Sequence, residues 1–71
     1  MNENTKNYIE EIMRYINNSM EKVERLIELE EEIQSYYHLS DQTQDESDEA
    51  LLHLNNAADL LQDAIAELEM V

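Results

Sequence analysis

The sequence predicts an all-α protein: an antiparallel helical hairpin that pairs with a second copy into a four-helix bundle homodimer. The 71 residues contain no glycine and no proline, so tight turns and phosphate-binding loops lack the residue they require. Apolar residues recur at steps of three and four in two long segments. A short polar stretch with several helix-capping residues separates these segments. A kinked three-helix bundle is the alternative.

The first helix is expected over residues 4–37, with Asn4 or Thr5 as its N-cap. Its apolar line consists of Ile9, Met13, Ile16, Met20, Val23 and Ile27, and beside it lie Tyr8, Ile12, Tyr15 and Leu26. Beyond Ile27 the line is expected to shift to Leu26, Leu29, Ile33 and Tyr36 or Tyr37, because a straight helix drifts against a seven-residue repeat. The resulting face covers about four of seven positions, which is wider than one neighbouring helix covers. We therefore expect this helix to contact two partners.

The residues Asn17, Asn18 and Ser19 are the weakest helix formers of this segment. A break here would produce the three-helix alternative, with Ser19 capping a new helix. The apolar spacing passes through the triplet undisturbed, which favours one continuous helix.

A turn is expected over residues 38–42 and a second helix over 43–70. Several residues can cap this helix, among them Ser40, Thr43 and Ser47. Thr43 followed by Glu46 matches the capping box, and Ser40 and Ser47 are each followed by acids that suit a helix N-terminus. We therefore expect the second helix to begin somewhere between Ser40 and Ser47.

The second helix carries the clearest apolar seam of the chain. Ala50, Ala57, Ala64 and Val71 recur every seven residues along one edge, so a neighbouring helix can approach closely on that side. The core and dimer interface are expected to consist of Leu51, Leu54, Ala57, Leu61, Ala64, Ile65, Leu68, Ile16, Met20, Val23 and Ile27. Pairing two hairpins would cover the apolar stripes that one hairpin leaves in water. In helix number and size this architecture resembles the small plasmid RNA-binding hairpin dimers. Those dimers bind RNA through basic surfaces that this chain lacks, so the resemblance implies the fold alone and no direct binding of nucleic acid.

Charge is the most unusual property of the sequence. Eighteen acidic residues stand against four basic ones, for a formal net charge of −14. All four basic residues lie within the first 25 positions, so residues 26–71 hold thirteen acids and no lysine or arginine. An ordinary exposed helix interleaves the two signs at four-residue steps for stability. The missing counter-charges therefore indicate selection for a basic partner.

The sequence offers no site for catalysis, a metal or a cofactor. There is no cysteine. Glu49 and His53 stand four residues apart and provide two potential metal ligands, but a metal site needs three or four with supporting contacts. The N-terminal segment is polar and no apolar run approaches the length of a membrane span. We predict a cytoplasmic protein with no enzymatic activity, no cofactor and no membrane contact.

Acidic residues repeat at four-residue steps, which places carboxylates about 6 Å apart along a helix, comparable to the phosphates of a nucleic-acid strand. The sequence therefore predicts a nucleic-acid mimic that blocks the basic groove of a DNA- or RNA-binding protein. The residues expected to bind this partner are Asp59, Asp63, Glu67, Asp45, Asp48, Glu49, Glu31 and Glu32.

In size, acidity and lack of catalytic residues the chain resembles phage-encoded inhibitors of host defence nucleases, including anti-CRISPR and anti-restriction proteins. This resemblance implies a DNA mimic that acts in the host cytoplasm against a defence nuclease. The alternative is a structural or regulatory helical module that binds a partner helix through its apolar face, around Tyr15, Met20 and Leu26. In that case the acidic residues serve solubility.

Overall fold

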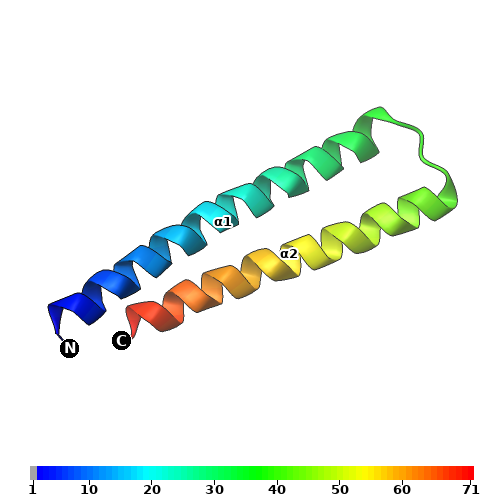
Figure 1. Cartoon of the computed structure of the whole chain (residues 1–71). Helices are drawn as coiled ribbons and strands as arrows, with labels where there is room; N and C mark the ends of the chain where they lie inside the picture. The colour runs from blue at the N-terminus through cyan, green and yellow to red at the C-terminus, as the bar shows by residue number, and fades with distance from the viewer. Residues whose placement is uncertain (1) are drawn as a thin grey trace.

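The computed structural model describes residues 2–71 as two long antiparallel helices, α1 (Glu3–Tyr36) and α2 (Asp41–Glu69), joined by a short connection over residues 37–40 (Figure 1). The hairpin is a rod whose Cα atoms extend over 55 × 15 × 11 Å. The prediction of an all-α hairpin is confirmed.

α1 begins earlier than expected, because Asn2 and not Asn4 or Thr5 is its N-cap. The Asn2 side-chain oxygen accepts a hydrogen bond from the Thr5 amide at 2.9 Å. The helix then continues without interruption through Asn17, Asn18 and Ser19. The kinked three-helix alternative is therefore wrong, since the apolar spacing on either side of the triplet belongs to one helix.

α2 begins at the early end of the expected range of residues 40–47. Ser40 is its N-cap: its Oγ accepts a hydrogen bond from the Thr43 amide at 3.2 Å and donates one to Thr43 Oγ1 at 2.8 Å. The Gln44 amide bonds to the Ser40 carbonyl at 2.8 Å, which starts the helical ladder there. Ser40 is preferred because its extended backbone leads directly from the connection into the helix, with Asp41 at the positive end of the helix dipole.

The two helices meet along one line of half-buried side chains. The predicted core residues lie on this line, half-buried in the hairpin: Ile16, Met20, Val23 and Ile27 from α1, and Leu51, Leu54, Ala57, Leu61, Ala64, Ile65 and Leu68 from α2. Within residues 2–71 no hydrophobic side chain is fully buried. A single hairpin therefore covers only one side of each apolar stripe.

Toward the connection the contact line becomes polar, which corrects the expectation that it would shift to Leu29 and Ile33. Glu30 and Gln34 of α1 occupy it, opposite Ser47 of α2. Gln34 Nε2 donates to Ser47 Oγ at 2.8 Å, and Ser47 Oγ donates to the Glu30 carboxylate. Ser47 is 5% exposed.

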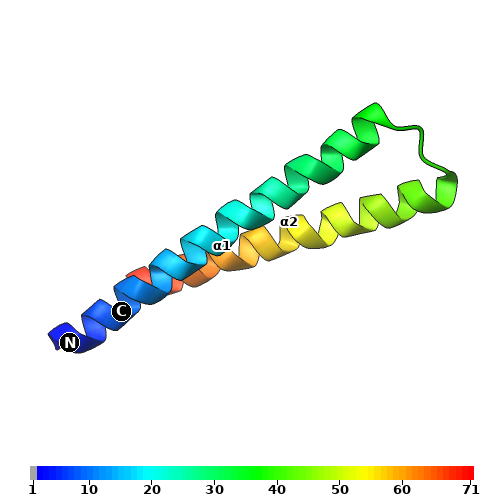
Figure 2. The ribbon, with the colours of Figure 1, turned by 45° about the horizontal axis from the view of Figure 1, so that its top comes forward.

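The helices diverge toward this polar end (Figures 1 and 2). The long side chains of Glu30 and Gln34 reach across the wider gap to Ser47, whereas Ala57 and Ala64 allow a closer approach farther along. The expected shift is absent because Glu30 and Gln34, which continue the steps of three and four beyond Ile27, are hydrogen-bonded to Ser47 and stay on the contact line.

Candidate protein-interaction surfaces

One broad side of the hairpin is apolar. On each helix, one row of side chains runs along either side, or flank, of the contact line. In an antiparallel pair, the corresponding rows of the two helices point to the same side of the hairpin. That flank places two central rows side by side: Ile12, Leu26 and Ile33 on α1, and Ala50, Ala57 and Ala64 on α2. Outside these rows lie Tyr8, Tyr15, Leu29 and Tyr36 of α1 and Leu60 of α2. We call these eleven residues the apolar face.

The large side chains of the apolar face are exposed in the hairpin. Leu26 is 51% exposed and Leu60 is 68% exposed, and Ile12 and Ile33 are exposed as well. Ser19 and Lys22 interrupt the face near its middle. Near the connection, a shallow hollow of about 440 Å³ is lined by Leu29, Glu32, Ile33, Tyr36 and Tyr37. Exposed apolar surface of this extent, on both sides of the interruption, is typical of an interaction site.

The predicted partner-binding acids are all exposed and lie mostly away from the apolar face. By the same helical geometry, six of the eight occupy the opposite flank or the outer surface of the two helices. Glu67 borders the apolar face, and Glu32 lines the hollow near the connection. Asp59, Asp63 and Glu67 follow the outer side of α2 toward its C-terminus. The structure thus brings these three together in one row and separates them along the rod from the other five, Asp45, Asp48, Glu49, Glu31 and Glu32.

Asp48 differs from the other predicted acids because it also takes part in the polar end of the helix contact. Its carboxylate accepts hydrogen bonds from Gln34 Nε2 at 2.9 Å and from Gln44 Nε2 at 3.0 Å. Glu30, Gln34, Gln44 and Ser47 were missed by the sequence reasoning. Continuing the steps of three and four past Ile27 and back from Leu51 would have found them.

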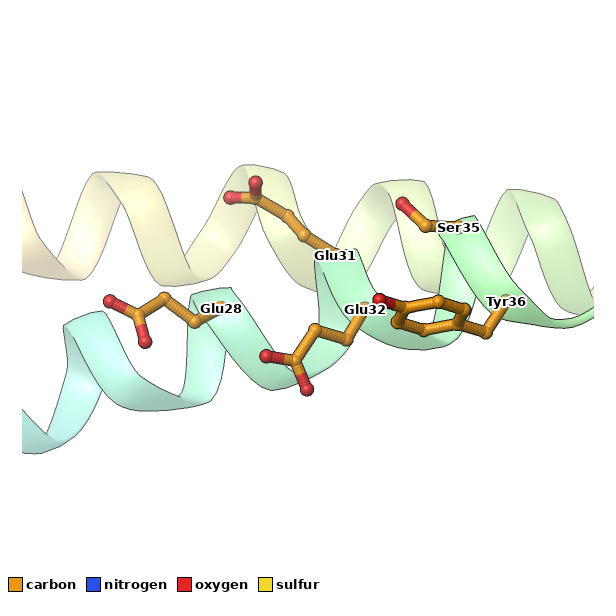
Figure 3. A pocket seen from close by; sticks show the side chains of 5 residues that line it. All are labelled: Glu28, Glu31, Glu32, Ser35 and Tyr36. Carbon is orange, nitrogen blue, oxygen red and sulfur yellow. The ribbon is translucent and has the colours of Figure 1, made fainter.

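Acids also gather on the C-terminal half of α1. Glu28, Glu31 and Glu32 line an open hollow of about 360 Å³ together with Ser35 and Tyr36. Figure 3 shows the three glutamates leaning toward the N-terminal end of α1, as side chains on a helix do. The hollow lies on the surface of a single helix and is not enclosed, so it does not sequester a small molecule.

Few of these carboxylates have a cationic partner. Over residues 2–71 the ion pair made by lysine or arginine is Arg25–Glu28 at 3.0 Å, and His53 Nε2 lies 3.8 Å from Glu49 Oε1, a contact that is ionic only when His53 is protonated. All four side chains are exposed. At the C-terminal end of α2, Glu67 and Glu69 face the negative end of the helix dipole, and its last turn has no basic residue. The chain therefore keeps acids where they reduce its own stability.

The described part of the chain contains no group of three or more His, Cys, Asp or Glu side chains arranged to hold a metal ion. Neither helix, over residues 2–71, has the length and apolar character to cross a membrane. The chain matches no protein-family model, no curated protein and no solved structure.

Proposed function

We propose that this protein is an inhibitor that imitates nucleic acid: it presents rows of carboxylates to the basic groove of a DNA- or RNA-binding protein and competes with the natural ligand. A defence nuclease of the kind that anti-CRISPR and anti-restriction proteins block is one such partner. The protein acts by binding and not as an enzyme. The observation that carries the proposal is the exposed row of Asp59, Asp63 and Glu67 on a chain segment without lysine or arginine.

The dimensions of the hairpin support this proposal. Its long axis of 55 Å equals roughly 16 base pairs at 3.4 Å per step. Carboxylates at four-residue steps along a helix stand about 6 Å apart, so one helix face offers a regular line of negative charge. A rigid rod keeps this line extended, because each row lies within a single continuous helix. A basic groove that binds a phosphate backbone can accept such a line.

The cost of the charge distribution also supports a role for it. Thirteen acids without one lysine or arginine repel one another across residues 26–71, which works against folding. Glu67 and Glu69 add an unfavourable interaction with the dipole of α2. Solubility alone does not require a net charge of −14, because a net charge of magnitude about 2 to 8 is enough for a small domain. A cationic partner compensates for all of these costs at once.

The test is capture of partners from a bacterial lysate on the immobilised chain, with elution by increasing salt. Association through exposed charges weakens as salt screens them, so the captured protein should elute at moderate salt and should be a nucleic-acid-binding protein. Adding duplex DNA should release it at constant salt. Retention of the partner at high salt and in the presence of DNA would exclude mimicry.

A second candidate function rests on a different observation, the exposure of the apolar face. A structural or regulatory module that binds a partner helix would bury Tyr15 and Leu26, both exposed in the hairpin. Apolar association depends little on salt. The salt elution described above therefore separates the two candidates.

A further inference from the structure

We propose that the apolar face is the interface for a second copy of this chain, with α1 of each copy lying over α2 of the other and both connections at the same end of a four-helix bundle. This proposal goes beyond the inhibitory function and does not depend on it. Three features of the hairpin indicate a second copy as the occupant: its excess surface, the absence of charge on the central rows, and the complementary sizes of these rows.

The surface area of the hairpin indicates that a partner is missing. Its accessible surface is 5754 Å². A compact monomer of 8.4 kDa is expected to expose about 4,600 Å² by the usual scaling with mass. The excess exceeds the roughly 800 Å² that each partner loses in a standard dimer interface. One dimer interface on the apolar face therefore brings the exposed surface into the normal range.

Charge indicates the face through which a second copy can approach. A chain of net charge −14 repels its own copies over most of its surface. The central rows of the apolar face carry no charged residue. The residue that interrupts the row on α1 is Ser19, which is polar but uncharged. The charged residues of this flank, Lys22, Glu46 and Glu67, lie at its outer edges. Pairing through the apolar face keeps the remaining acids outside the interface.

The sizes of the central rows determine which helix faces which. The row on α1 is large, with Ile12, Leu26 and Ile33, whereas the row on α2 consists of alanines. Laying α1 over the partner's α2 sets Ile12, Leu26 and Ile33 against small side chains, and only Ser19 leaves small side chains on both sides. Laying α1 over the partner's α1 sets large against large and leaves a gap between the two alanine rows.

The register of the hairpin makes these rows interdigitate. The hydrogen bonds of Glu30 and Gln34 to Ser47 set residues 30–34 level with Ser47. Counting the same number of residues from this level along each of the two antiparallel helices places Leu26 between Ala50 and Ala57 along the axis of the rod. When α1 lies over the partner's α2, Leu26 of one copy therefore inserts between two alanines of the other.

The first measurement is the mass of the full chain in solution by sedimentation equilibrium, from about 1 µM to about 200 µM. The expected mass is about 17 kDa, twice the 8.4 kDa of one chain. A fully helical species of 8.4 kDa over the whole range would overturn the proposal and would leave the apolar face for a helix of another protein.

A matched pair of variants tests the face itself. Ile33→Asp places a charge in the central row, and Ser35→Asp adds the same charge two residues away on the opposite flank. We expect Ile33→Asp to weaken dimerisation about a hundredfold or more, because it removes buried apolar area and adds a desolvated carboxylate. Ser35→Asp should remain a dimer. Equal dimerisation of both variants would contradict the assignment.

Cross-linking tests the arrangement without relying on a destabilised variant, since the natural chain has no cysteine. A mixture of Leu26→Cys and Ala50→Cys chains should form the mixed product with a short bis-maleimide. A mixture of Ile12→Cys and Ile33→Cys chains should not, because these positions lie far apart along the rod when the connections share one end. The reverse result would overturn the proposed arrangement.

Discussion

The apolar face and the acidic residues on the rest of the hairpin are both exposed, yet they differ in what water does for them. Water stabilises a carboxylate, so Asp59 and Asp63 remain exposed without a partner. Water does not stabilise the 51% of Leu26 that the hairpin leaves uncovered. Burial against a partner would therefore stabilise the apolar face, whereas the unpaired acids lower stability by repelling one another.

The largest effect is expected from reversing charge on the outer side of α2. The triple variant Asp59→Lys, Asp63→Lys and Glu67→Lys should weaken capture of the basic partner by about a hundredfold or more, because it replaces attraction by repulsion at the contact. Helicity should not fall, since lysines near the C-terminal end suit the helix dipole. Circular dichroism measures the helicity, and capture from the lysate measures the binding of the partner.

The control for this variant reverses the same number of charges on the other helix, at Glu10, Glu11 and Glu21, which are all exposed. This control changes the net charge by the same amount as the α2 variant, and it should still capture most of the partner. Equal loss in both variants would show that net charge alone, and not the row on α2, determines binding.

A smaller effect separates the two sides of the hairpin with one substitution. Leu26 and Leu52 are exposed to similar extents, 51% and 57%, but only Leu26 lies on the apolar face. Leu26→Ser should lower the free energy of unfolding by about 2 kcal/mol, because a partner buries this side chain. Leu52→Ser should change it by only about 0.5 kcal/mol or less. Urea unfolding at equal protein concentration measures both; similar losses would remove the distinction between the sides.

The polar end of the helix contact should contribute less. Ser47→Ala leaves Gln34 and the Glu30 carboxylate without their shared hydroxyl, at an expected cost of about 1–2 kcal/mol. Ser35→Ala is the matched control, because Ser35 is exposed and should change stability by about 0.5 kcal/mol or less. Thermal unfolding of the two variants makes the comparison. No difference between them would mean that this hydrogen-bonded layer adds nothing to stability.

The smallest expected effect concerns the start of α2. Ser40→Ala removes the cap that accepts from the Thr43 amide and should cost about 1 kcal/mol. Ser40→Gly should cost only a few tenths of that energy, since glycine leaves the helix end open to water. If Thr43→Val lost about 1 kcal/mol of stability and Ser40→Ala lost none, Thr43 with Glu46, and not Ser40, would cap the helix.

The hairpin was predictable because its two apolar lines keep their spacing of three and four residues over most of their length. The exposure of the predicted acids followed from the same spacing. The polar end keeps the same spacing, but Glu30 and Gln34 are hydrophilic, so residue type alone assigns them to the surface until Ser47 is known to lie opposite them. The start of α2 was predicted only to within residues 40–47 for a similar reason. Ser40 and Thr43 can both cap, and the path of the connection decides between them.

The most direct test of the proposed function is the affinity of the captured partner for the chain as a function of salt, with and without duplex DNA. The account predicts a dissociation constant that rises steeply with salt concentration, and competition in which DNA and the protein exclude each other from one groove. An affinity that is independent of salt, or a ternary complex of partner, DNA and this protein, would contradict it.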